Sequence, residues 1–276
     1  MELVMIDLIF WPLLASFVLT GIHVYLGLHV VTRGVIFVDL ALAQVAALGA
    51  AVGIVMGLDH DGNASYMMAL AFTFIGAAFF AYIRSIDQKV PQEAIIGITY
   101  VVCAAAMILL FSKSAEGSEH LNHLLVGSIL YVTPEKIAYT ALLYTAIGFF
   151  HWKYKQQFFE ISQSHLKTTE LNSSDRFWDF LFYVTFGFVV TSSVKIARVL
   201  LVFSFLIIPT IAALLFKESI RGRLIFGWCF GIFGSLLGMF ISITADVPTG
   251  AAIVVSFGIM LAILGIVKYF INNKSK

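Results

Sequence analysis

A carboxylate and an amide lie inside an otherwise apolar stretch of this chain, at Asp39 and Gln44. An ionisable side chain within a membrane costs roughly 2.5–3.5 kcal/mol on insertion scales, so it normally marks an ion or substrate pathway. Two histidines, His23 and His29, lie in the preceding apolar stretch. Together these side chains indicate chemistry on a cation: a carboxylate, an amide oxygen or an imidazole can each bind a metal ion, and the carboxylate and imidazoles can bind a proton.

Helix geometry limits how these groups can act together. At 100° per residue, Asp39 and Gln44 lie about 140° apart and the two histidines roughly 120° apart, so at most one of each pair faces a central path. Asp39 has the strongest claim, because leaving it toward lipid is the most costly option. A structural bond from Asp39 to Arg33 or to neighbouring backbone is the alternative, and a structural role is open for each histidine.

The elements that position these residues are expected to be membrane-spanning helices. Of the 276 residues, 60% are hydrophobic and only 12% charged, whereas about 25% charged residues are usual in a soluble domain. A shorter apolar piece at 121–133 is typical of a re-entrant or interfacial helix, and 153–175 is a polar connection. The sequence therefore predicts an all-α polytopic membrane bundle, formed as one domain over residues 1–276. The predicted spans, about nine, are 9–31, 35–57, 66–84, 93–112, 135–152, 177–195, 199–216, 224–245 and 250–271.

The positions of the basic residues predict the orientation in the membrane, and the small residues predict how the helices pack. With the N-terminus outside and nine spans, thirteen of the 17 Lys and Arg residues fall on the inner side, which predicts an N-out, C-in topology. Stripes of Gly and Ala in the spans 35–57 and 224–245 favour close helix packing or a tight subunit interface. The net charge of +1 argues against nucleic acid as a partner and leaves membrane lipid.

The predicted outer loops carry a second group of candidates. Imidazole and carboxylate together suit divalent first-row metals, although such residues can also be merely solvated. These outer-mouth candidates are Asp59, His60, Asp61, His120 and His123.

The sequence lacks the common motifs for nucleotide binding and hydrolysis. It contains no G-x-x-x-x-G-K-[ST] phosphate loop, no G-x-S-x-G elbow and no H-E-x-x-H zinc helix. If transport uses ATP, another polypeptide must bind it. We therefore do not expect an enzyme.

Five stretches resemble the permease subunits of zinc-, manganese- and iron-type metal ABC transporters. The stretch 30–49 resembles that family's second-helix signature, an arginine followed by G-D-A-L-S-H and a later glycine. The stretch 92–98 is similar to its E-D-x-x-I-G-I segment, 124–130 to its L-F-G-x-x-L, 200–213 to its L-L-x-x-L-L-I-x-P-A-x-x-A run, and 246–251 to a late D-x-P-x-G segment. Each match alone is weak, but five in the family's order are a strong resemblance.

This resemblance implies an importer subunit in the plasma (inner) membrane of a prokaryote. Its partners would be two cytoplasmic ATPase subunits, a second permease copy and an extracytoplasmic metal-binding protein. It implies no permanently bound cofactor, only a transported divalent metal ion. The family's coupling segment maps to Pro209, Ala212, Ala213, Lys217 and Glu218, which the predicted topology places on the inner side.

The sequence departs from the family at the ligand pair. When the stretch is aligned on Gly49, the aspartate and histidine of G-D-A-L-S-H become Leu40 and Gln44, while Asp39 falls at the family's glycine. A leucine and an amide form a much poorer site for zinc or manganese. Either His23 or His29 supplies a ligand, or the pore passes the ion without holding it.

A stand-alone secondary cation carrier, with Asp39 as its coupling site, is the alternative to an ATP-driven importer. An intramembrane enzyme is disfavoured because the spans show no clear pair of nucleophile and base.

Overall fold

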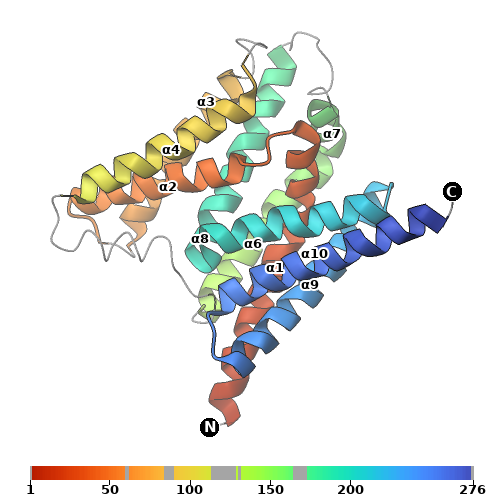
Figure 1. The fold of residues 1–276 in the computed structure, drawn as a ribbon. Coiled ribbons are helices and arrows are strands. Elements are labelled where there is room, and N and C mark those ends of the chain that lie inside the picture. Colours follow the sequence, from red (N-terminus) through yellow and green to blue (C-terminus); the bar gives the residue numbers. More distant parts are fainter. Residues whose placement is uncertain are drawn as a thin grey trace. The chain divides into compact units, whose positions relative to one another are not determined.

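The computed structural model describes residues 2–59, 62–83, 90–112, 129, 132–163 and 173–274, and all regular structure in these ranges is helical (Figure 1). Helices are expected here because no water is available in a bilayer to satisfy exposed backbone groups. The predicted all-α fold is therefore confirmed. The helices are α1 (Glu2–Arg33), α2 (Val38–Val55), α3 (Asn63–Ile83), α4 (Gln92–Phe111), α6 (Pro134–Lys153), α7 (Lys155–Gln163), α8 (Ser173–Phe216), α9 (Ile220–Ala245) and α10 (Thr249–Lys274).

Within the described residues, seven helices are long and apolar enough to cross a membrane: α1, α2, α3, α4, α8, α9 and α10. Helix α8 runs for 44 residues and is interrupted at Arg198, where φ is 60° and ψ is 166°. The predicted spans 177–195 and 199–216 lie on either side of this break. Helix α6 matches the predicted span 135–152 but is not among the seven, so its crossing of the membrane stays a prediction. Most of the predicted piece 121–133 lies outside the described residues.

The chain forms two compact units, of which the first contains Met1–Leu28, Gly127–Tyr144 and Ile196–Lys276. Helix α9 packs against α1 and α10 through its glycines. A Cβ on Gly231 would lie 2.6 Å from the Thr20 methyl group of α1. A Cβ on Gly238 would lie 2.7 Å from the backbone nitrogen of Ile253 in α10. The predicted small-residue stripe in this span thus brings helices into close contact.

The second unit contains His29–Val126 and Thr145–Lys195. Helix α2 packs against both α3 and α4, and the three helices lie side by side in Figure 1. A Cβ on Gly49 of α2 would lie 2.8 Å from the Cβ of Phe72 in α3. On the α4 side, Ala51 is buried with Met107 and Phe111. The small residues of α2 therefore let both neighbours approach its backbone.

A tight turn joins α1 to α2 and places Asp39. Gly34 adopts φ 69°, which an L-residue rarely takes. Its N–H donates to Val31 O at 3.2 Å, and the N–H of Val35 donates to Val30 O at 3.3 Å. This pair of bonds is a Schellman motif that ends α1 at Arg33. Helix α2 starts at Val38, so Asp39 lies in its first turn.

Candidate functional site

Asp39 is buried at the N-terminal end of α2. Its side chain is 1% exposed, and Oδ1 has no hydrogen-bond partner in the described part of the chain. The free N–H groups of a helix's first turn favour a negative charge nearby, so they offset part of the cost of burying this carboxylate. A buried carboxylate oxygen without a protein partner is able to accept a proton or to bind a cation. The predicted burial of this residue is confirmed, whereas its role in a pathway stays a prediction.

Gln44 is the second buried oxygen donor on α2. It is 3% exposed, and its Oε1 has no partner among the described residues. Because α2 is a regular helix, Gln44 lies about 7.5 Å further along the axis and about 140° around it from Asp39. Asp39 therefore shares its face with the small residues Ala43 and Ala46, while Gln44 lies on the side of Ala51, which packs on α4. The two donors do not converge on one point.

A hydrogen bond from α4 fixes the start of α2. The N–H of Phe37 donates to Glu93 Oε1 at 3.0 Å. The neighbouring Gln92 donates through Nε2 to Tyr183 Oη at 3.0 Å and to Phe80 O at 3.1 Å. Glu93 Oε2 and Gln92 Oε1 are buried and have no described partner. Polar oxygens therefore gather where α2 and α4 begin.

Arg33 forms a buried ion pair that the sequence reasoning missed. Its Nη1 lies 2.5 Å from Asp179 Oδ1 of α8, and both side chains are fully buried. Its Nε donates to Ser162 Oγ of α7 at 3.0 Å. The guanidinium carbon lies 3.7 Å from the centre of the Phe182 ring. Arg33 thus pairs with Asp179 and not with Asp39. The other form of the predicted alternative, a bond between Asp39 and neighbouring backbone, stays a prediction.

His29 belongs to this same cluster. Its Nδ1 lies 2.8 Å from Ser162 Oγ. The Ser162 hydroxyl donates to Phe158 O at 2.8 Å, so its oxygen accepts from both His29 and Arg33. His29 therefore carries its proton on Nδ1. A buried guanidinium that binds the same hydroxyl opposes a divalent cation at this imidazole.

His151 extends the cluster toward the end of α6. Its ring stacks on Phe158 with the two centroids 3.9 Å apart, and its Nε2 lies 2.8 Å from Thr185 Oγ1. The Thr185 hydroxyl donates to Leu181 O at 2.8 Å, so the histidine N–H donates to Thr185. The ring of His29 lies 6.5 Å from that of His151. The buried histidines of this unit are thus held by hydroxyl and aromatic contacts.

His23 lies in the first unit, whereas Asp39, Gln44 and His29 lie in the second. The ring is fully buried and packs edge-on against Tyr144, with centroids 6.1 Å apart. Its Nδ1 donates to Leu19 O at 2.7 Å, which leaves the lone pair of the neutral ring on Nε2. Such a backbone bond is the usual way to orient a histidine that uses its other nitrogen.

No group of three or more His, Cys, Asp or Glu side chains that could hold a metal ion occurs in the described ranges. Of the outer-mouth candidates only Asp59 falls within them. It is exposed, and its backbone carbonyl accepts from Ser65 Oγ at 2.6 Å at the start of α3. The other four, His60, Asp61, His120 and His123, lie outside the described residues.

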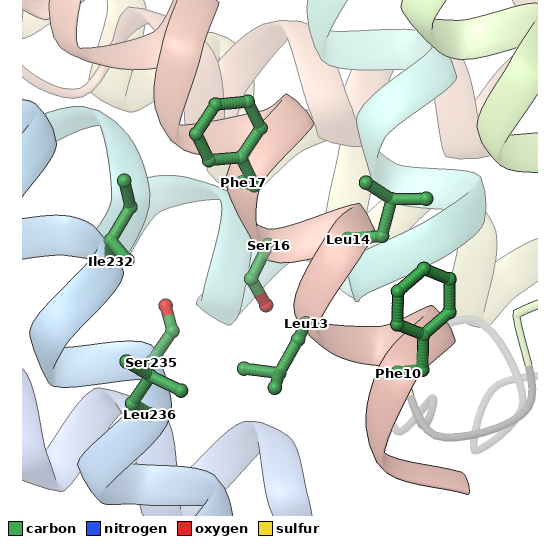
Figure 2. A pocket seen from close by; sticks show the side chains of 8 residues that line it. All are labelled: Phe10, Leu13, Leu14, Ser16, Phe17, Ile232, Ser235 and Leu236. Atoms are coloured by element: carbon green, nitrogen blue, oxygen red, sulfur yellow. The ribbon is translucent and has the colours of Figure 1, made fainter. Parts of the chain in front are cut away.

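A pocket of about 300 Å³ lies between α1 and α9 in the first unit, and Figure 2 shows the residues that line it. Ser16 and Ser235 are its only hydroxyl residues. Each donates to a carbonyl of its own helix, to Pro12 O at 2.9 Å and to Gly231 O at 2.7 Å. The rest of the lining is apolar, so this pocket is unsuited to a metal ion. The lining residues are Phe10, Leu13, Leu14, Ser16, Phe17, Ile232, Ser235 and Leu236.

The predicted coupling segment divides into a buried and an exposed part. Pro209, Ala212 and Ala213 are buried in α8. Lys217 and Glu218 are exposed in the turn before α9. Of these five residues, Lys217 and Glu218 alone expose their side chains, and the coupling role itself stays a prediction.

These features define a helical, multi-pass membrane protein with a buried carboxylate at the start of its second helix. The model of the ABC 3 transport family matches residues 5–268. The chain therefore belongs to this family, and the predicted resemblance to metal ABC transporter permeases is confirmed.

Curated relatives match most of the chain at low identity. The manganese import system permease protein ScaB of Streptococcus gordonii is 24% identical over 254 residues, covering 91% of this chain and 86% of ScaB. The manganese transport system membrane protein MntC of Listeria monocytogenes is 24% identical over 236 residues, covering 83% and 79%. A probable iron transport system membrane protein of Haemophilus influenzae is 26% identical over 171 residues, covering 61% and 62%.

Solved structures share the fold. A chain of PsaBC from Streptococcus pneumoniae in complex with Fab is similar with a TM-score of 0.74 and 24% identity, covering 93% of this chain and 90% of that one. An inward-facing putative metal-chelate type ABC transporter is similar with a TM-score of 0.68 and 17% identity, covering 92% and 84%.

Proposed function

We propose that this chain is the membrane-spanning permease subunit of an ATP-binding-cassette importer for manganese or iron. The observation that carries the proposal is the family match over residues 5–268, joined by relatives named for manganese or iron transport. The two units form one permease domain that pairs with a second copy in a prokaryotic plasma membrane. Separate cytoplasmic subunits hydrolyse ATP, and an extracytoplasmic protein delivers the metal ion.

The donor atoms on α2 favour manganese among the metals considered. Asp39 Oδ1 and Gln44 Oε1 are buried oxygens without described partners. Carboxylate and carbonyl oxygens suit Mn²⁺, whereas imidazole and thiolate suit zinc and copper. The ion contacts Asp39 and Gln44 in succession, because these residues lie on different sides of α2. The chain thus passes the ion along rather than holding it in one closed site.

The histidines take different parts in this proposal. His29 is a structural residue, since Ser162 and the Arg33 cation occupy its surroundings. His23 remains a candidate ligand through Nε2. At the inner side, the exposed turn with Lys217 and Glu218 is the contact for the ATPase.

Variants of Asp39 and Gln44 test the pathway. In cells that depend on this chain, we expect Asp39→Ala to abolish uptake of radioactive Mn²⁺ while the complex still assembles. Gln44→His adds an imidazole, so we expect tighter retention of the metal. Glu160→Gln removes a carboxylate from the exposed face of α7 and is the matched control. Normal uptake by the assembled Asp39→Ala variant would show that the ion does not use this residue.

A liposome experiment separates the importer from the secondary carrier. We expect liposomes that contain this chain alone to accumulate no Mn²⁺ under an imposed proton or sodium gradient. Gradient-driven uptake without an ATPase would favour the carrier instead.

A further inference from the structure

Arg33 pairs with Asp179 and not with Asp39, although Asp39 is much closer to it along the chain. Arg33 and Asp39 are separated only by the tight turn after α1. Nevertheless Arg33 is held by Asp179 and Ser162, 146 and 129 positions away along the chain. Its Nη2 is buried and has no described partner. Arg33 therefore has an N–H donor, and Asp39 an acceptor oxygen, that no described residue binds.

A chain of contacts connects the guanidinium to the start of α2. The Arg33 Cζ atom lies 5.6 Å from the centre of the Tyr183 ring. The Tyr183 hydroxyl accepts from Gln92, and the adjacent Glu93 accepts from the N–H of Phe37. Phe37 immediately precedes α2 and lies two positions before Asp39. The Arg33 side chain is thus linked to the start of α2 through the Tyr183 ring and the adjacent residues Gln92 and Glu93.

A buried guanidinium needs a counter-ion, because an uncompensated buried charge is strongly destabilising. Asp179 fills this need and is itself fully buried. The start of α2 holds two other carboxylates, Asp39 and Glu93, and each has a buried oxygen with no described partner. Glu93 is already bound to Phe37 and is only partly buried. Asp39 is the more buried of the two, so it gains more from an opposite charge.

We propose that Asp179 is a positioning residue that holds Arg33 away from Asp39 and so leaves the Asp39 carboxylate available to the transported cation. The inference rests on the proposed function of Asp39. Ser162 and the Phe182 ring hold the same guanidinium from other sides. When a substitution removes the Asp179 charge, Arg33 competes with the metal ion for Asp39.

The test is metal uptake by the complete transporter with charge-neutral variants. We expect Asp179→Asn to raise the apparent KM for Mn²⁺ at least about tenfold, a change that corresponds to ~1.4 kcal/mol of binding free energy. The maximal rate per assembled complex is retained, because high Mn²⁺ displaces the guanidinium. Asp179→Glu, which keeps the charge, restores a KM close to that of the parent. Glu160→Gln on α7 again controls for the loss of a carboxylate.

The double variant separates positioning from a merely structural ion pair. In R33Q/D179N no guanidinium remains to bind Asp39, so we expect a KM within about threefold of the parent value. This change is smaller than the tenfold rise, ~1.4 kcal/mol, expected for D179N alone. If D179N fails to accumulate in the membrane, the double variant alone carries the test. An unchanged KM in D179N, or a raised KM in an assembled double variant, would overturn the inference. Normal uptake by Asp39→Ala would instead overturn the proposed function, so the two failures are distinguishable.

Discussion

Replacing Ser162 by alanine is expected to loosen the docking of α7. The Ser162 oxygen accepts from Arg33 Nε at 3.0 Å and from His29 Nδ1 at 2.8 Å, and all three residues are buried. Alanine leaves both donors unsatisfied, and each buried unsatisfied group costs about 1–3 kcal/mol. The local free energy of opening should therefore fall by about 2–6 kcal/mol for the two donors. The pair of Arg33 with Asp179 remains, so the unit still folds.

Hydrogen–deuterium exchange of the purified protein in detergent measures this change directly. A fall of ~2 kcal/mol makes exchange of the α7 amides about 30-fold faster, since ~1.4 kcal/mol corresponds to a factor of ten. Ser256→Ala in α10 is the matched control. Ser256 is also buried, but within the described part of the chain its hydroxyl bonds Ala252 O of its own helix alone, at 2.8 Å. If Ser162→Ala and Ser256→Ala change exchange equally little, the cluster does not hold α7.

Three further predictions concern the turns and helix contacts. Gly34→Ala places a side chain at φ 69°, so we expect a loss of roughly 1–2 kcal/mol, seen as a lower thermal midpoint in detergent. Gly238→Ala sets a Cβ 2.7 Å from the Ile253 nitrogen and should cost about 1–3 kcal/mol. Gly258→Ala, which meets nothing within 4 Å, is the control, and equal midpoints for these two variants would refute the contact. Replacing Lys217 and Glu218 together by alanine should leave the permease stable but lower the metal transported per ATP hydrolysed; an unchanged ratio would place the ATPase contact elsewhere.

The helices and the burial of their polar residues could be predicted from the sequence because membrane insertion imposes simple rules. The apolar runs at 9–31 and 35–57 place the C-terminal end of α1 and both ends of α2 close to where the structure has them. The cost of an exposed charge in lipid correctly predicts that Asp39 is buried. These are local properties of single segments.

The partner of Arg33 could not be predicted in the same way. Asp179 lies in the predicted span 177–195, and the rule applied to Asp39 would have marked it as a buried carboxylate. Its pairing with Arg33 nevertheless joins positions 146 apart and depends on how α1 and α8 pack. Ser162 lies in a stretch predicted as a polar connection. It becomes part of the cluster because Phe158 and Ile161 bury one face of α7.

The central claim is that this chain imports manganese or iron as part of an ATP-driven complex. Uptake of radioactive Mn²⁺ and Fe²⁺ tests it most directly, in cells that lack the chain and in cells that regain it with an active or an inactive partner ATPase. We expect uptake of one of these metals to be lost with the chain and restored only when the ATPase is active. Uptake that is unaffected by loss of the chain, or restored equally with the inactive ATPase, would contradict the claim.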